Sequence, residues 1–406
     1  YQGLVRNYNE DRVSIIINMS RPKNYTKTYW PKTSFFGIYD GHGGNACSEF
    51  LRDCLHKLIF NDINYPENVP EAIKNGFFNA EKDFLNNYTL DKDGETVLDK
   101  SGSCAVIIII VDNKIYVANV GDSRGLLSLD NGNEFLVITE DHKPNNEKEK
   151  NRIIQSGGQV YQSQTVINDT ENEYLNGQIL LGPFRVLPGR LSVSRTIGDI
   201  EAKNPKFGGN PNVIIPTPDI FIYDLNEDNI DFLLLGCDGI YDQMSNEEII
   251  DCCWKVINDD KLGNNIHDKC GLIVDFILKA SMIRKSFDNV TCLIVAMKDF
   301  TDPNNEKNQY ESKKSTQLIN GIKNDFKIEL SSKKVKGSYN SIVNRRSVNS
   351  PENAKKKQKS KITFDLKENQ DKINSNSPVN DNKNIANTGS NKFLNNNREE
   401  TYIETD

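Results

Sequence analysis

The chain has 406 residues, of which 36% are hydrophobic and 26% are charged, and its formal net charge is -7. This length exceeds what one hydrophobic core usually supports, so we expect one large domain and a further segment. The negative balance excludes the overall positive field that would hold nucleic acid or an acidic membrane surface.

The eight cysteines are scattered, with no CxxC pair and no histidine at zinc-finger spacing. Several lie in apolar runs, where a free cysteine packs as a small hydrophobe, so we expect reduced thiols and a cytoplasmic or nuclear location. The longest apolar run, Ala105–Val111, is far shorter than the roughly 20 residues that span a bilayer. The chain opens at Tyr1 and not at a methionine, so we expect missing upstream residues, which leaves membrane anchoring through them open.

Alternating strands and helices are predicted in the first part of the chain. Residues 12–17 and 34–39 have the composition of strands, and the second runs into the turn Asp40-Gly41-His42-Gly43-Gly44. Apolar residues then recur at helical spacing up to residue 58, which predicts an amphipathic helix directly after the turn. Residues 102–111 and 114–120 are apolar and rich in branched side chains, and Asp112-Asn113 between them favours a hairpin.

The second part continues with strands and two helices. Strands are predicted over residues 123–129, 232–236 and 290–297. The segment from Ser245 to Glu248 has the form of a capping box, and a helix should follow it; another is predicted over residues 266–282. Hairpins joined without regular crossover helices favour antiparallel sheets with helices outside them.

Beyond residue 299 the chain is rich in Asn, Lys, Ser and Asp, and its apolar residues are isolated. Such a segment cannot bury enough apolar surface to offset its ordering entropy, so disorder is expected. The basic run at residues 355–361 reads as a solvated stretch more readily than as a localisation signal. Ser347, Ser350 and Ser377 are candidate kinase sites, with an unmodified tail as the alternative.

Three carboxylates, Asp40, Asp238 and Asp288, follow apolar strands or lie beside tight turns. Each alone reads as ordinary turn chemistry. Together at one sheet edge they would repel each other unless a cation neutralised them, and hard divalent cations bind such oxygen clusters. The repetition therefore predicts a divalent metal site.

Two further residues add charge and a titratable group near these carboxylates. Arg6 lies close in sequence to Glu10 and Asp11, where a surface ion pair is the simpler interpretation of the arginine alone. His42 stands between glycines beside Asp40, and the turn should expose it, which favours proton transfer over a packed core position.

These residues belong to an ordered set of motifs between residue 1 and about residue 297. The set comprises Asn9-Glu10-Asp11, Tyr39-Asp40-Gly41-His42-Gly43-Gly44, Gly102-Ser103, Gly121-Asp122-Ser123-Arg124, Asp141-His142-Lys143-Pro144, Ser194-Arg195-Thr196-Ile197-Gly198-Asp199, Cys237-Asp238-Gly239-Ile240-Tyr241-Asp242 and Asp288-Asn289-Val290-Thr291. Each motif alone is common, but the ordered set is very specific. It resembles the metal-dependent serine/threonine protein phosphatases of the type 2C class, with a PPM-type phosphatase domain.

The resemblance implies an α+β fold, a four-layer α/β/β/α sandwich with two central antiparallel sheets. The phosphatase domain would cover residues 1–299 with its first strand truncated, and the tail residues 300–406. The implied activity is hydrolysis of phosphoserine and phosphothreonine on proteins by a hydroxide that bridges two divalent cations, Mn²⁺ or Mg²⁺. Phosphoproteins are then the expected partners, nucleic acid is not, and we expect a monomer.

The resemblance also implies a role for each matching residue. Asp40 is similar to the carboxylate that bridges both ions, the carbonyl of Gly41 to a ligand of one ion, and Asp238 and Asp288 to ligands of the other. Glu10 and Asp11 resemble residues that hold metal-bound waters, and Asp122 with Asp238 and Asp242 resembles a weaker third metal position. Arg6 resembles the arginine that binds the substrate phosphate, and His42 the acid that protonates the leaving alkoxide.

One departure from the family's simpler form lies between the motifs. Residues 159–190 are longer than expected, and we interpret them as an expanded flap beside the active site. Two other functions are weighed. A catalytically inactive scaffold should lose Asp40, Asp238 or Asp288, all of which are present, and a two-metal nuclease should show basic, aromatic-interleaved surface segments, which the folded part lacks.

Overall fold

The computed structural model describes residues 1–297 except residues 24, 26, 167–177, 226–228 and 260–264. They belong to the first of two units into which the chain divides, Tyr1–Asn324 with Glu399–Asp406; the second is Asp325–Arg398. The predicted tail, its basic run and its candidate kinase sites lie outside the described residues.

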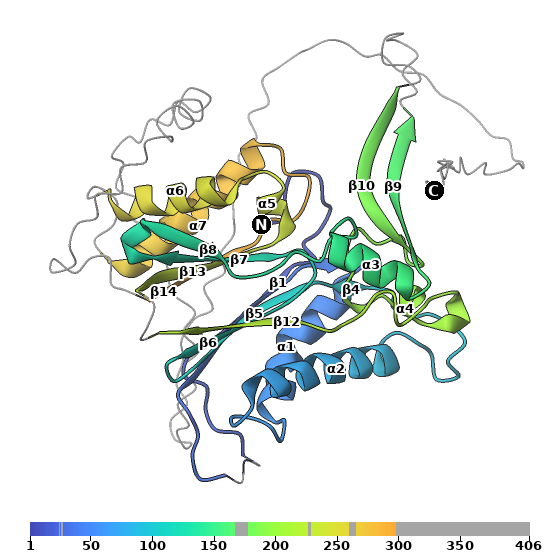
Figure 1. The fold of residues 1–406 in the computed structure, drawn as a ribbon, viewed down its shortest axis with the longest axis horizontal. Coiled ribbons are helices and arrows are strands. Elements are labelled where there is room, and N and C mark those ends of the chain that lie inside the picture. Colours follow the sequence, from blue (N-terminus) through green and yellow to red (C-terminus); the bar gives the residue numbers. More distant parts are fainter. Residues whose placement is uncertain (24, 26, 167–177, 226–228, 260–264, 298–406) are drawn as a thin grey trace, which may run out of the picture. The chain divides into compact units, whose positions relative to one another are not determined.

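Two antiparallel sheets form the centre of the described part (Figure 1). The five-stranded sheet has the order β1-β2-β5-β6-β12 and the four-stranded sheet the order β14-β13-β7-β8. The strands of the first are β1 (Arg12–Ile16), β2 (Thr33–Tyr39), β5 (Ala105–Val111), β6 (Lys114–Val120) and β12 (Asp219–Asp224). Those of the second are β14 (Cys292–Ala296), β13 (Ile230–Gly236), β7 (Arg124–Leu129) and β8 (Glu134–Val137).

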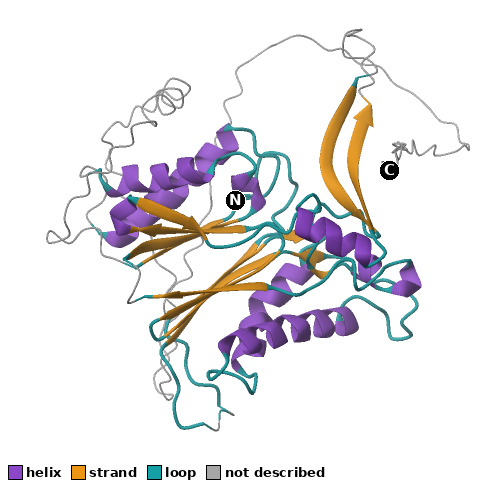
Figure 2. Ribbon diagram, in the orientation of Figure 1, coloured by secondary structure: helices purple, strands orange, loops and turns teal. Residues whose placement is uncertain are grey.

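Helices cover the outer face of each sheet, as Figure 2 shows by colour. Helices α1 (Ala46–Phe60) and α2 (Val69–Asn87) pack on the five-stranded sheet. Helices α6 (Asn246–Ile257) and α7 (Ile266–Ile283) pack on the four-stranded sheet. The four-layer sandwich predicted from the sequence is therefore confirmed.

The alternation of side chains along the central strands produces these layers. In β5, Ile107 and Ile109 pack toward the helices, whereas Val106 and Ile108 pack between the sheets. Successive side chains of a strand point to opposite faces, so a continuous apolar run is buried on both sides. The same division in β13 sends Leu234 to the helices and its neighbours to the centre of the sandwich.

Most predicted elements are present within one or two residues of their expected ends. The Ser245 capping box is formed, because its side chain accepts from the Glu248 N–H while the Glu248 carboxylate accepts from the Ser245 N–H. The strand predicted over residues 102–111 is instead two strands, β4 (Gly102–Ser103) and β5. Cys104 separates them, since its N–H donates to the Asp40 carbonyl at 2.8 Å.

That break lets β4 form a small sheet of its own. It pairs with β3 (Gly41–His42) on one side and β11 (Ile197–Gly198) on the other. The short elements nearby are α3 (Glu147–Gln155), α4 (Ile200–Lys203), α5 (Asp238–Tyr241), η1 (Asp130–Gly132) and η2 (Pro205–Phe207). The predicted flap contains an antiparallel hairpin of β9 (Gln159–Val166) and β10 (Ile179–Leu187), whose connecting residues lie outside the described part.

The cysteines have the state expected from the sequence. All eight fall within the described part, and every one is a free thiol. Among the helices that the structure describes, none has both the length and the apolar character to cross a membrane.

Candidate metal centre

The predicted metal-binding carboxylates come from the ends of different elements. Asp40 lies between β2 and β3, Asp122 follows β6, Asp238 begins α5 directly after β13, and Asp288 precedes β14. Strands from both sheets thus deliver their terminal carboxylates to one region, where a local turn role for each cannot explain their closeness.

Asp40 and Asp238 form the most crowded part of this cluster. Together with Cys237 they bring ligand atoms within 4.8 Å of one another. Burial first, and then repulsion from Asp238, Asp11 and other carboxylates, raises the pKa of Asp40 well above its usual range. Burial and the neighbouring carboxylates raise the pKa of Asp238 in the same way. The buried negative charge is therefore not matched by the cationic side chains around it.

Asp11 adds an oxygen that the protein itself leaves without a partner. Its Oδ2 accepts from the Thr291 hydroxyl at 2.6 Å, whereas its Oδ1 is buried and unpaired. Burial, partly offset by hydrogen bonds, raises the pKa of Asp11 to about 6. An unpaired buried carboxylate oxygen is costly, so a cation or a cation-bound water is the fitting partner for it.

The backbone at Gly41 passes too close to the chain before β1 for any side chain. A Cβ there would collide with the Glu10 carbonyl and the Ser48 hydroxyl. Ser48 donates to that carbonyl at 2.5 Å, and the Gly44 N–H donates to the Glu10 carboxylate at 2.6 Å. Glycine at this position thus lets β3 lie against the segment that carries Glu10 and Asp11.

Arg6 lies at the exposed rim of the cluster. Its Nη2 donates to Asp288 Oδ2 at 2.7 Å, and its Nη1 is 3.8 Å from Glu10 Oε2. Asn289 holds this N-terminal segment in place, since its side chain accepts from the Glu10 N–H and donates to the Tyr8 carbonyl. With 45% of its side chain exposed, Arg6 keeps room to contact an incoming anion.

His42 contacts a carboxylate that the sequence interpretation did not assign to the site. His42 Nε2 lies 2.9 Å and 3.0 Å from the two carboxylate oxygens of Asp199. Burial disfavours the charged imidazole, but the Asp199 charge outweighs it and raises the pKa of His42. Since Asp199 engages Nε2, Nδ1 is the nitrogen that remains for proton transfer to another molecule.

A lysine lies among the carboxylates of the predicted third metal position. Lys143 Nζ is 3.8 Å from Asp122 Oδ2 and 3.3 Å from Asp242 Oδ1. Burial raises the pKa of Asp122 to about 6, while Lys143 opposes the rise. Asp242 has 55% of its side chain exposed, so this position is more open to solvent than the cluster around Asp40.

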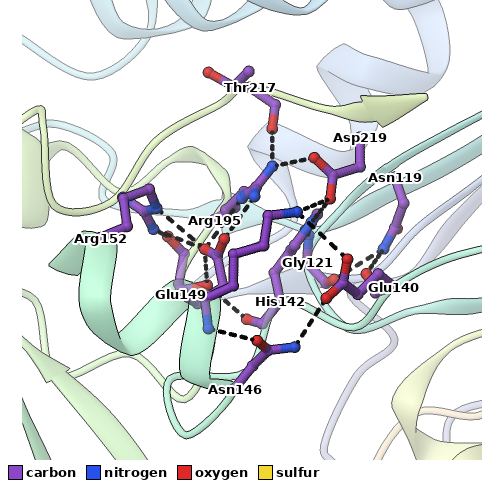
Figure 3. Close-up of polar contacts among 12 residues, drawn as sticks. Asn119, Gly121, Glu140, His142, Asn146, Glu149, Arg152, Arg195, Thr217 and Asp219 are labelled. Atoms are coloured by element: carbon purple, nitrogen blue, oxygen red, sulfur yellow. Dashed lines mark hydrogen bonds and ion pairs between the residues drawn. The ribbon is translucent and has the colours of Figure 1, made fainter.

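A buried ionic network lies beside this position (Figure 3). Arg195 Nη2 and Nε donate to the two carboxylate oxygens of Glu149 at 2.6 Å and 3.1 Å, and Arg195 Nη1 donates to Asp219 at 2.8 Å. His142 connects the network to Asp122, because its Nδ1 accepts from the Gly121 N–H while its Nε2 lies 3.3 Å from Asp219. The network thereby joins α3 to the chain just before Asp122.

All ten residues singled out in the sequence therefore lie in one region, linked by contacts or mutual electrostatic effects. The sequence interpretation missed Asp199 and Lys143, although both stand in quoted motifs, Gly198-Asp199 and His142-Lys143. Nothing local distinguishes an aspartate after a glycine from a turn residue. The importance of Asp199 arises from its contact with His42, which is 157 residues away along the chain.

Comparison with known proteins identifies the family of the chain. The family model described as "Protein phosphatase 2C" matches residues 7–282. The chain is 31% identical over 267 residues to "Protein phosphatase 2C homolog 2" of Hypocrea jecorina, covering 64% of this chain and 54% of that protein. It is 32% identical over 262 residues to "Probable protein phosphatase 2C 27" of Arabidopsis thaliana, covering 64% of this chain and 58% of that protein. The chain thus spans little more than half the length of these relatives.

Solved structures share the fold at lower identity. A Caenorhabditis elegans sex determining protein has a TM-score of 0.56 at 23% identity, covering 74% of this chain and 64% of that one. The serine-threonine phosphatase 2C of Toxoplasma gondii has a TM-score of 0.52 at 18% identity, covering 73% of this chain and 93% of that one. At these identities the likeness concerns the fold alone.

Proposed function

We propose that this chain, which belongs to the protein phosphatase 2C family, hydrolyses phosphoserine and phosphothreonine in proteins. The reaction would use divalent cations bound at the acidic cluster. The observation that carries the proposal is the convergence of buried carboxylates whose charge the protein does not neutralise, with an arginine and a histidine at their rim. We place this activity in the cytoplasm or nucleus, in keeping with eight free thiols.

The residues fit Mn²⁺ or Mg²⁺. The donors are carboxylate oxygens and one backbone carbonyl, which hard cations prefer, and Asp11 supplies a buried oxygen without a partner. Asp40, the Gly41 carbonyl, Asp238 and Asp288 would hold two ions directly, with Glu10 and Asp11 holding their waters. When bound, the cations supply the hydroxide that attacks phosphorus and the Lewis acidity that stabilises the transition state.

The Cys237 thiol, although close to Asp40 and Asp238, is not assigned as a ligand. Its sulfur accepts from the Thr291 N–H at 3.1 Å and donates to the Asn289 carbonyl at 3.4 Å. Burial, with the nearby carboxylates, raises the pKa of Cys237 well above its usual range, so the neutral thiol is favoured. We infer that Cys237 joins β13 to the segment before β14.

The remaining chemistry belongs to Arg6 and His42. The planar guanidinium of Arg6 matches a phosphate in a two-point hydrogen bond, and its exposure allows a protein substrate to reach it. His42, held through Nε2 by Asp199, can deliver the proton on Nδ1 to the serine or threonine oxygen as the ester bond breaks. An alkoxide leaves poorly without that proton, so this step should matter for phosphoserine.

Phosphopeptide hydrolysis with and without added Mn²⁺ or Mg²⁺ tests the proposal. We expect turnover that depends on the cation and disappears on chelation, and no cleavage of single-stranded nucleic acid. Loss of a residue that only orients a metal ligand typically costs roughly 10- to 100-fold in activity. Asp40→Asn removes a proposed direct ligand, so it should lower turnover by more than this without unfolding the domain. Cation-independent phosphopeptide hydrolysis, or cleavage of nucleic acid alone, would contradict the assignment; inactivity on all substrates would favour the inactive scaffold.

A further inference from the structure

The contact between His42 and Asp199 is formed across a small three-stranded sheet. His42 of β3 lies opposite Gly102 of β4, and Gly102 lies opposite Gly198 of β11. A Cβ at position 102 would overlap the Asp199 carboxylate. The absence of a side chain on the middle strand therefore lets Asp199 reach directly over it to the imidazole.

The backbone that presents Asp199 is in an unfavourable conformation. Gly198 has φ 85° and Asp199 has φ 57°, so two consecutive residues occupy the left-handed region. This conformation is costly for a residue with a Cβ and persists only when surrounding contacts hold it. One such contact is the Asp199 N–H, which donates to the Ser101 carbonyl at 3.0 Å.

A buried ion pair supplies a further contact. Glu81 of α2 accepts from the Gly198 N–H through Oε2 at 2.8 Å and from Lys203 Nζ through Oε1 at 2.6 Å. Lys203 in turn donates to the Thr196 carbonyl at 2.8 Å. The two side chains therefore hold the strand before Asp199 and the helix after it, while both are almost fully buried.

A buried ion pair is weak support for a purely stabilising role, because the cost of removing two charges from water offsets much of their attraction. What Glu81 provides besides charge is an acceptor for one backbone N–H, that of the residue just before Asp199. Displacement of that residue by a fraction of an ångström would move the Asp199 carboxylate relative to His42.

We propose that Glu81, supported by Lys203, is a positioning residue for the general acid: its hydrogen bond to Gly198 fixes Asp199 and thereby the orientation of His42. The inference rests on the proposed phosphatase function. It assigns to α2, on the outer face of the sandwich, a part in protonating the leaving group. Among the described residues Glu81 makes no hydrogen bond or ion pair with His42 or the acidic cluster; it reaches Asp199 through the Gly198 N–H of β11 and through electrostatic interaction.

Two double variants separate positioning from stability. Glu81→Gln/Lys203→Met and Glu81→Leu/Lys203→Met both lack the ion pair and leave no charge at positions 81 and 203, but only the glutamine keeps an acceptor for the Gly198 N–H. Turnover is measured for each on a phosphoserine peptide and on an aryl phosphate, whose leaving group needs no proton, with His42→Ala as the reference for loss of the acid. Melting curves monitor folding.

We expect the glutamine variant to keep the wild-type ratio of the two rates. The leucine variant should lose at least about tenfold in kcat on the peptide, because small misplacement of a catalytic group is costly, with less than about twofold loss on the aryl phosphate and an unchanged KM. If the leucine variant does not fold, Glu81→Asp tests the same point: it keeps the charge for Lys203 but withdraws the acceptor from Gly198, so the peptide rate should again fall selectively.

Equal losses on both substrates, or the same rate ratio in the glutamine and leucine variants, would overturn the inference and leave Glu81 a structural residue. That result differs from failure of the proposed function, in which the wild-type protein would hydrolyse neither substrate in the presence of cations.

Discussion

Arg6 is held by carboxylates that are themselves proposed to bind cations. Its guanidinium donates to Asp288, which is 282 residues away in the chain, and lies near Glu10, which is four residues away. The position of Arg6 therefore depends on both a distant and a local carboxylate. Of the groups proposed to act on substrate, it is the more exposed, with 45% of its side chain accessible against 32% for His42. This arrangement suits a group that binds the phosphate before the reaction begins.

Replacement of Arg6 should therefore affect substrate binding more than chemistry. In Arg6→Ala we expect KM for a phosphopeptide to rise by about 10- to 100-fold, the range set by charge-assisted hydrogen bonds worth roughly 1.5–3 kcal/mol, with a smaller change in kcat. Steady-state kinetics at saturating Mn²⁺ measure this effect. Arg6→Lys keeps the charge but loses the planar fork, so its KM should lie between those of the wild type and Arg6→Ala.

An unchanged KM in Arg6→Ala would mean that the arginine only neutralises Asp288. In that case the cation concentration needed for activity should change instead, since the same carboxylate would lose its partner.

Helix α3 is joined to the segment around Arg195 by the ionic network of Figure 3. Besides Arg195, the Glu149 carboxylate accepts from Arg152 at 2.9 Å and from the Ser194 hydroxyl at 2.6 Å. Burial alone would raise the pKa of Glu149, but these hydrogen bonds outweigh it and lower the pKa to about 2. The β9–β10 hairpin follows this helix directly in the chain.

The lowered pKa predicts how this network responds to acid. Because the folded-state pKa of Glu149 is about 2 and its ordinary value is 4.5, its stabilising effect is fully present above about pH 4.5 and is lost as the pH falls through 2. Glu149→Gln should lower the free energy of unfolding by roughly 3 kcal/mol at pH 7, and the difference from wild type should fall by about half at pH 3. Urea unfolding at pH 7, 4.5 and 3 measures it.

Glu147→Gln is the matched control, because Glu147 lies on the exposed face of the same helix. It should cost less than about 1 kcal/mol, the usual range for a charge at a helix N-terminus. A Glu149→Gln effect that stays constant between pH 7 and pH 3 would show that the charge of Glu149 contributes nothing and that only its packing does.

The two ends of the described part of the chain close on each other. The Tyr1 backbone nitrogen donates to the Val290 carbonyl at 2.7 Å, and the Val290 N–H donates to the Tyr1 carbonyl at 2.9 Å. At the other end β14 completes the four-stranded sheet, and the Met297 N–H donates to the Asp231 carbonyl at 2.9 Å. Every contact used above for the candidate metal centre lies between these limits.

A chain ending at Met297 should therefore keep cation-dependent turnover of a short phosphopeptide, with kcat within about twofold of the full chain, since the candidate site and its supports are retained. Parallel assays and melting curves of both forms test this. Loss of turnover on truncation would instead mean that the tail supports the catalytic domain.

We expect phosphorylation of Ser347, Ser350 or Ser377 to change docking or location and not the chemistry, because it adds about 1.5 to 2 negative charges outside every motif.

Local patterns in the sequence were enough to predict antiparallel sheets with helices outside them, whereas the four stacked layers were implied by the family resemblance. Strand and helix periods, the capping box at Ser245 and the turn at Asp112 depend on neighbours a few residues apart, so they can be recognised without knowing the rest of the molecule. The carboxylates after strands were recognisable for the same reason. Their family resemblance then pointed to roles that remain to be tested.

The contacts that organise the site could not be predicted in this way. Glu81 and Lys203 look like ordinary surface charges in their helices, yet they are buried against each other across 122 residues. Asp199 resembles a turn residue until β11 is placed beside β4 and β3. The burial of a charge and the identity of its partner depend on how distant segments pack, because desolvation and Coulomb attraction act through space and leave no periodic mark along the chain.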